Sequence, residues 1–237
     1  MPLPVTELLH RPTCSIASEH RYSLAPRAKS TFRSVVSAHE LLGNASDQYV
    51  EVRIVETGDD IRLDFEYPLA RGVIREQLSL RGVGDHLAAA RLERSVFDTS
   101  GARVRYELTD FGDEVLPLPP ATYPEVALPF LLSFQPHDGK ERDVFAWIND
   151  RMLARVDYRT TGTETLSLPS GTLPAIKCIM YPDFNDWVPL GKIVGKLVHP
   201  FVPKYHMWFA TEPPHHVLRF EGPYGPPGAP EIVMELV

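Results

Sequence analysis

The strongest constraint on the fold is an alternation of apolar and polar residues with a period of two. Between Tyr49 and Tyr67, apolar side chains at every second position are separated by charged ones, and the turn residues 58–60 divide the run in two. Successive side chains of a β-strand point to opposite faces of a sheet, so the pattern is typical of antiparallel strands with one buried face. We therefore predict a β-hairpin over residues 49–67.

The same alternation recurs along much of the chain. The run Ala88-Ala89-Ala90 is also compatible with a helix. The hairpin and the segments below add up to about eleven strands, which predict an all-β fold: an antiparallel β-barrel or strongly curved half-barrel, with a β-sandwich as the alternative. The further strands are expected at 72–80, 87–97, 104–108, 152–158, 164–168, 172–180, 205–210, 216–221 and 232–236.

Prolines indicate where the strands are interrupted. The 237 residues include 23 Pro, a residue that central strands exclude because it cannot donate to the ladder. A Pro-rich bridge at 116–136 holds the apolar run 126–132, which predicts one short helix or a covering loop. Residues 185–203 lose the alternation and space their apolar side chains as a helix does, so we expect a lid-like helical insertion. Residues 1–30 are expected to be an extended N-terminal segment of a single domain, 1–237.

Charge and composition exclude several classes of protein. The chain has 24 Lys+Arg and 31 Asp+Glu, a formal net charge of −7, which argues against a nucleic-acid partner. Its most apolar window, 115–135, contains several prolines and Glu125, so no transmembrane segment is expected. The N-terminus lacks the basic and apolar regions of a signal peptide, and we therefore expect a cytoplasmic protein. The sequence leaves the oligomeric state open.

Motifs for metals and cofactors are missing from the sequence. Cys14 and Cys178 are far apart and lack the spacing of a thiolate metal site. His215 and His216 are adjacent, so on a strand they would point to opposite faces. No P-loop, G-x-G-x-x-G or G-x-S-x-G motif occurs. We therefore expect neither a metal nor a cofactor.

Candidate site residues follow from the expected barrel, because about eleven strands enclose more space than their inward side chains fill. His206 lies on a predicted strand and has a near-neutral pKa that suits acid–base catalysis. Asp186 is the second catalytic candidate, at the barrel mouth, although an Asx turn or helix N-cap would also explain it. Candidate ligand-binding residues are aromatic and methionine side chains that would otherwise fill the core: Phe65, Tyr67, Tyr106, Tyr158, Met180, Trp187, Trp208 and Phe209.

The second half of the chain also carries a family resemblance. Its matching pieces are the turn and strand segments 162–165, 168–172, 208–209 and 217–220, together with the apolar segment from Tyr123 and the DGKERDVFAWIND strand. In this order they resemble the bacterial domain-of-unknown-function family 3108, whose members look like open β-barrels related in shape to periplasmic lipoprotein carriers. The resemblance covers about half of the chain. It implies a cavity-forming scaffold and no known reaction.

Two hypotheses about function follow. The first is that a mostly apolar small molecule binds in the barrel cavity. The alternative is a cofactor-independent cyclase or isomerase that acts on a hydrophobic biosynthetic intermediate in the same cavity, with His206 or Asp186 as the acid–base group. A purely structural or interaction module is a third possibility.

Overall fold

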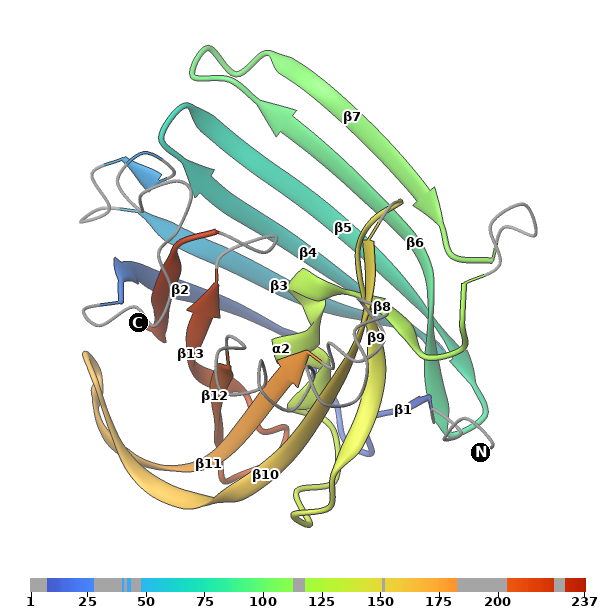
Figure 1. Ribbon diagram of the computed structural model, residues 1–237, viewed down its shortest axis with the longest axis vertical. Helices are drawn as coiled ribbons and strands as arrows, with labels where there is room; N and C mark the ends of the chain where they lie inside the picture. The colour runs from blue at the N-terminus through green and yellow to red at the C-terminus, as the bar shows by residue number, and fades with distance from the viewer. Residues whose placement is uncertain are drawn as a thin grey trace, which may run out of the picture.

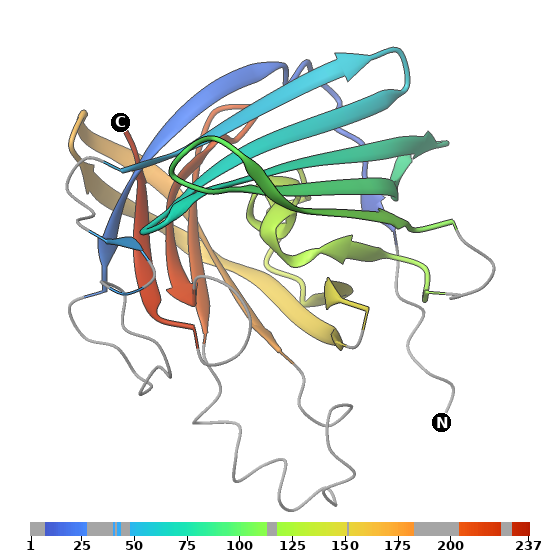
Figure 2. The ribbon, with the colours of Figure 1, turned by 90° about the horizontal axis from the view of Figure 1, so that it is seen from above.

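The structure, a computed structural model, describes residues 8–27, 40, 42–43, 48–112, 118–150, 152–182, 204–223 and 229–237. These residues form one open sheet of 14 strands that curves into a half-barrel, with one short helical segment (Figures 1 and 2). The prediction of an all-β, strongly curved half-barrel is therefore confirmed, and the β-sandwich alternative is not adopted. Among the described residues, no helix is long and apolar enough to cross a membrane.

The sheet consists of two meanders of six strands each, in which sequence neighbours are also spatial neighbours. The last strand of the second meander pairs with the first strand of the first, and this contact joins them. The first meander comprises β2 (Ser18–Pro26), β3 (Tyr49–Thr57), β4 (Asp60–Leu69), β5 (Gly72–Val83), β6 (His86–Phe97) and β7 (Arg103–Asp110). The second comprises β9 (Arg142–Asn149), β10 (Met152–Leu168), β11 (Gly171–Pro182), β12 (Tyr205–Ala210), β13 (Val217–Pro223) and β14 (Glu231–Leu236).

Several elements differ from the sequence prediction. The ambiguous run 88–90 is part of β6, because β5 pairs with it along nearly its whole length. The strands predicted at 152–158 and 164–168 are one strand, β10, with an irregularity between Thr160 and Gly162. The segment expected to be merely extended contains β2, which joins the meanders, and β1 (Leu9–His10), which pairs with β6. The lid-like insertion predicted at 185–203 lies outside the described residues.

The described part of the Pro-rich bridge runs inside the curve of the sheet (Figure 1). It forms β8 (Thr122–Pro124), a 3-10 turn η2 (Glu125–Ala127) and the helix α2 (Leu128–Leu132). All five residues of α2 are buried, and the ring of Phe130 lies 5.8 Å from that of Tyr22 and 5.4 Å from that of Phe65. The bridge therefore supplies apolar side chains to the concave face, as the core of a half-barrel requires.

Side chains of the bridge also close one end of the half-barrel. The hydroxyl of Tyr123 accepts the Leu9 N–H at 3.0 Å and donates to the Leu87 carbonyl at 2.5 Å, which ties the bridge to β1 and β6. The side-chain amide of Gln135 accepts the His10 N–H at 2.8 Å and donates to the His10 carbonyl at 3.2 Å. These bonds satisfy strand groups that would otherwise be left unpaired at the sheet edge.

Candidate functional site

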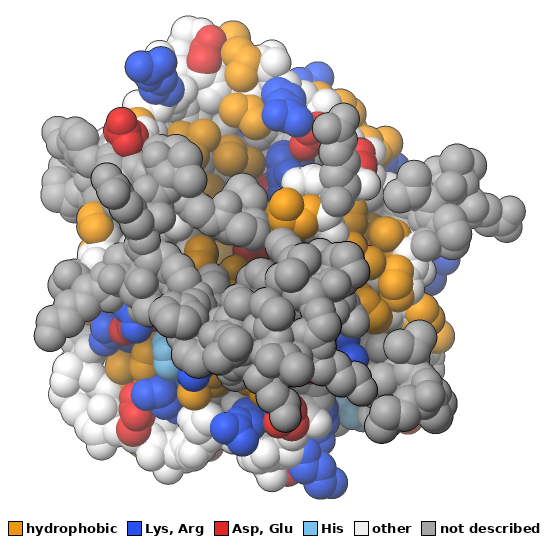
Figure 3. Space-filling model, viewed as in Figure 1, with side chains coloured by type: hydrophobic (Ala, Val, Ile, Leu, Met, Phe, Trp, Pro, Cys, Tyr) orange, Lys and Arg blue, Asp and Glu red, His pale blue; other side chains and the backbone are white. Residues whose placement is uncertain are grey.

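A cavity of about 450 Å³ lies on the concave side of the half-barrel. Its walls come from strands of both meanders and from the bridge, and they are mostly apolar. Figure 3 shows hydrophobic side chains in the hollow of the sheet where other atoms leave it visible. This volume falls within the range of small-molecule sites, about 300–1,000 Å³. Representative apolar lining residues are Ile74, Val96, Phe130, Met180, Phe220 and Met234.

One wall of the cavity carries four charged side chains. Three of them, Glu76, Arg94 and Glu107, form what we call the inner charged row, and the fourth, Arg105, pairs with Glu107. The three residues of the row lie directly opposite one another on β5, β6 and β7. Nε of Arg94 donates to Oε1 of Glu76, and a terminal nitrogen of Arg94 lies 3.6 Å from Oε2 of Glu107. Glu76 is only 4% exposed, and its burial raises the pKa of its carboxyl while the Arg94 guanidinium opposes the shift. The row is therefore an ion-paired cluster that is buried at Glu76 and becomes more exposed toward Glu107, whose side chain is 35% exposed.

A carboxyl group from the bridge faces the same cavity. Glu125, on η2, accepts a hydrogen bond from the Tyr205 hydroxyl at 3.3 Å. Burial raises the pKa of the Glu125 carboxyl to about 7, and the bond from Tyr205 opposes this shift. Burial also raises the pKa of the Tyr205 hydroxyl well above its ordinary value, so that group stays protonated. Near neutral pH, Glu125 is thus able either to donate or to accept a proton.

The ligand-binding candidates on the concave face separate into two groups. Tyr67 and Met180 are among the residues that line the cavity. Phe65, Tyr158 and Phe209 are buried in the main core and are not among its lining residues. Phe65, for example, packs against Phe130 of α2.

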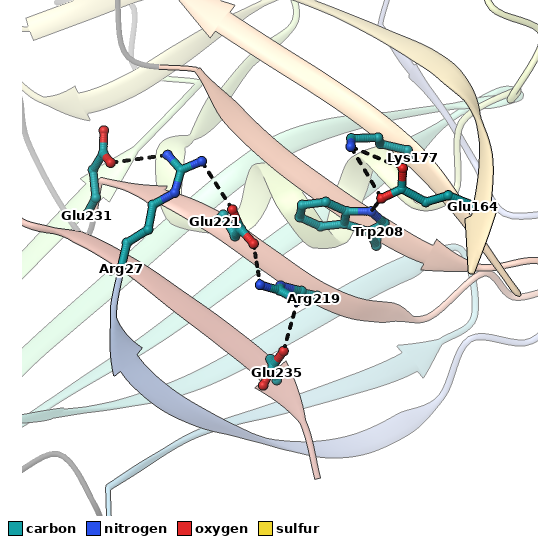
Figure 4. Close-up of polar contacts among 8 residues, drawn as sticks. All are labelled: Arg27, Glu164, Lys177, Trp208, Arg219, Glu221, Glu231 and Glu235. Atoms are coloured by element: carbon teal, nitrogen blue, oxygen red, sulfur yellow. Dashed lines mark hydrogen bonds and ion pairs between the residues drawn. The ribbon is translucent and has the colours of Figure 1, made fainter. Parts of the chain in front are cut away.

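His206 and Trp208 lie on the convex face of the sheet, because they alternate along β12 with Met207 and Phe209 of the main core. Trp208 packs in a separate small cluster and donates its indole N–H to Glu164. Lys177 lies over the Trp208 ring, 5.0 Å from its centroid, and Figure 4 shows these contacts. Neither His206 nor Trp208 therefore reaches the cavity.

The remaining candidates also lie apart from the cavity or outside the described residues. Tyr106, on β7, is 46% exposed, and its hydroxyl donates to Glu93 at 3.2 Å. Asp186 and Trp187 belong to the part of the chain that the structure does not describe.

Sequence reasoning missed the ionisable groups of the cavity. Glu76 and Arg94 occupy inward positions of strands whose other inward residues are apolar, such as Leu78 and Leu92. Glu125 is the one charged residue of the bridge 116–136 and directly precedes its apolar run. In each case the signal was a charge where the pattern required an apolar side chain.

The histidines and cysteines do not form a metal site in the described part of the chain, where no group of three or more His, Cys, Asp or Glu is arranged to hold an ion. Nε2 of His20 and Nδ1 of His216 lie 2.9 Å apart, and the rings of His137 and His215 are 4.9 Å apart. Burial lowers the pKa of His20 to about 4, with His216 as a second cause, so the two rings pair in their neutral forms. These histidines lie apart from the residues that line the cavity.

Comparisons with known proteins leave the family open. No family model matches the chain, and no curated protein matches it. Among solved structures, the chain is similar to a protein of Bacteroides fragilis described as a presumed exported protein with a YmcC-like fold, with 11% sequence identity over 97% of each chain and a TM-score of 0.28. A TM-score this low carries no argument about fold or function.

Proposed function

We propose that the protein binds a mostly apolar small molecule in the cavity between the two meanders. The observation that carries the proposal is the cavity itself, about 450 Å³ with largely apolar walls and a few ionisable side chains. Small-molecule sites combine these features, because apolar contact provides affinity and a few polar groups fix orientation. Burying about 200 Å² of apolar ligand surface would contribute about 5 kcal/mol.

The ionisable groups favour a ligand with one polar end. Glu125 with Tyr205, the inner charged row, Arg105 and Asn149 are the polar features of a cavity whose other walls are apolar. Protonated Glu125 would donate a hydrogen bond to a carbonyl or ether oxygen, whereas ionised Glu125 would accept one from an amine or hydroxyl. The ligand class is therefore an apolar body with a single hydrogen-bonding group.

A cavity-filling substitution tests the binding proposal. Ile74→Trp adds bulk to a residue that lines the cavity, whereas Leu173→Trp adds the same bulk to a side chain that is 43% exposed on β11 and lies outside it. The probe is the neutral apolar fluorophore N-phenyl-1-naphthylamine. We expect Ile74→Trp to weaken its binding at least about tenfold and the control to leave it unchanged. Equal binding by both variants would contradict the proposal.

A second candidate function is a cofactor-independent isomerase or cyclase that uses the same cavity. The observation in its favour is Glu125, whose pKa is raised to about 7 beside the Tyr205 hydroxyl. A carboxyl with this pKa in a mostly apolar pocket suits general acid–base catalysis at neutral pH. In this proposal Glu125 takes the acid–base role that the sequence suggested for His206 or Asp186.

Deuterium incorporation separates the two candidate functions. Molecules that co-purify with the protein are identified by native mass spectrometry and are then incubated with fresh protein in D₂O. An isomerase that removes and returns a carbon-bound proton labels the ligand, and Glu125→Gln is expected to abolish the labelling while ligand binding persists. Binding without labelling in the wild-type protein would favour a binding protein.

A further inference from the structure

We propose that two copies of this chain associate through their β7 strands, which pair antiparallel and join the two sheets into one. β7 pairs with β6 on one side, and no described strand pairs with its other side. Figure 1 shows β7 at the outer rim of the sheet. A free edge of this kind is a template for a further strand.

The backbone of β7 has groups that point outward along the free edge. The amide of Phe111 donates to the Ala90 carbonyl, which continues the register of the β6–β7 ladder by one pair. In an antiparallel ladder, hydrogen-bonded and non-hydrogen-bonded pairs alternate, so the N–H and C=O groups of Leu108 and Tyr106 point away from β6; at Val104 the register shifts. These groups are placed to bond with a second strand.

The side chains of β7 are unusually apolar on the convex face for a strand at a free edge. Val104, Tyr106 and Leu108 are 61%, 46% and 50% exposed, and they are three of the six exposed large hydrophobic residues in the described part of the chain. Edge strands that remain solvent-exposed usually carry charges or prolines on such positions. The exposed apolar side chains of β7 therefore indicate that another strand covers this edge.

The order of residues identifies the partner as a second β7. In an antiparallel pair centred on Tyr106, Arg105 lies opposite the second copy's Glu107, and Val104 lies opposite its Leu108. Each of these pairs occurs twice by symmetry, and Tyr106 faces its own copy, so charges and apolar groups both match. An unrelated strand would share this pattern only by chance. Arg105 and Glu107 pair with each other within one chain, and Glu107 also lies 3.6 Å from Arg94, so dimerisation exchanges the partner of Arg105 and leaves the Arg94 contact in place.

Two charge reversals test the proposal in the full chain. Arg105→Glu places two Glu–Glu pairs across the interface, and Glu107→Arg places two Arg–Arg pairs there, so each variant alone is expected to self-associate at least about tenfold more weakly than the wild type. An equimolar mixture restores two Glu–Arg pairs and should form a heterodimer. Sedimentation velocity over a range of concentrations measures all three samples.

A proline substitution gives a second test that involves no charge. Tyr106→Pro removes an N–H that points away from β6, so the fold is expected to persist, whereas Tyr106→Thr retains that N–H and is the matched control. We expect the dimer to be lost in Tyr106→Pro and weakened less in Tyr106→Thr. A wild-type protein that stays monomeric up to about 100 μM, or a mixture of the charge-reversal variants that stays monomeric, would overturn the proposal.

Discussion

Two groups of charged residues of the same kinds lie on opposite faces of the sheet. The inner charged row lies on the concave face, where the side chain of Glu76 is 3% exposed and that of Arg94 is 23% exposed. On the convex face, Lys177 and Glu164 form what we call the outer charged pair, 3.2 Å apart, in which the Glu164 side chain is 44% exposed (Figure 4). Both groups connect neighbouring strands, and their cations Arg94 and Lys177 are similarly exposed, at 23% and 28%. The groups therefore differ chiefly in the exposure of the carboxylates Glu76 and Glu164.

This difference determines what each group contributes. An exposed ion pair is screened by water and contributes about 0–1 kcal/mol. A buried pair has lost its hydration, so it adds little net stability when intact but leaves a costly unpaired charge when one partner is removed. Because Glu76 is buried, the inner charged row is costly to break, whereas the outer charged pair is not.

Removal of Arg94, the cation of the inner charged row, is the strongest test of the difference between the two charged groups. Arg94→Met leaves Glu76 buried without its partner, and we expect the free energy of unfolding to fall by about 3–5 kcal/mol at neutral pH. Burial raises the pKa of Glu76, and loss of Arg94 raises it further, so Glu76 becomes neutral as the pH falls. The destabilisation should therefore be smaller at pH 5 than at pH 8, as measured by urea unfolding.

The matched control for Arg94→Met is Lys177→Met, which removes the cation of the outer charged pair. Glu164 stays solvated in that variant, so the loss should remain below about 1 kcal/mol at every pH. Equal losses in the two variants would show that burial does not distinguish the two groups.

The carboxyl of Glu125 gives the next largest effect, seen in the pH dependence of stability. Its pKa in the folded protein is raised by burial to about 7, above the value of about 4.3 for an unperturbed Glu. The folded state therefore binds the proton more tightly, and the stabilisation is complete below about pH 4 and is lost as the pH rises through 7. In the wild type, the free energy of unfolding should therefore decrease by up to about 3 kcal/mol between pH 4 and pH 8 because of Glu125, and we expect this decrease to be absent in Glu125→Gln.

Urea unfolding of the wild type and Glu125→Gln across this pH range measures the effect. Glu164→Gln is the control, because its hydrogen bonds to Trp208 and Lys177 lower the pKa of the Glu164 carboxyl and it stays ionised over most of the range. An unchanged slope in Glu125→Gln would mean that Glu125 is not the titrating group.

Much of the fold could be predicted from the sequence because half-buried strands carry a local signal. The alternation around Gly58 predicted the β3–β4 hairpin, and the prolines predicted the bridge. β2 was missed because its residues Ser18 to Arg21 are polar or partly exposed, and only its pairing with β14 and β3 makes it a strand. Pairing between distant segments cannot be read from a local pattern.

The candidate site was harder to predict, for a different physical reason. The sequence indicated aromatic residues on strands but not which face each strand presents, so His206 and Trp208 were grouped with the cavity although they lie on the convex face. The cavity carboxyl Glu125 depends on the path of the bridge into the half-barrel, which only the folded sheet defines. The sequence did contain one signal for the cavity wall that was not used: a charged residue at an inward position of a strand, such as Glu76 on β5.

The smallest effect belongs to the outer charged pair and tests its exposure directly. Glu164→Gln removes the charge but retains an amide oxygen that can accept the Trp208 indole N–H, so only the attraction to Lys177 is lost. We expect the free energy of unfolding to decrease by less than about 1 kcal/mol at low ionic strength, and the difference to vanish in about 1 M NaCl, where the Debye length is about 3 Å. A loss that persists in high salt would mean that this pair is shielded from solvent as Glu76 is, and the contrast between the two faces would then fail.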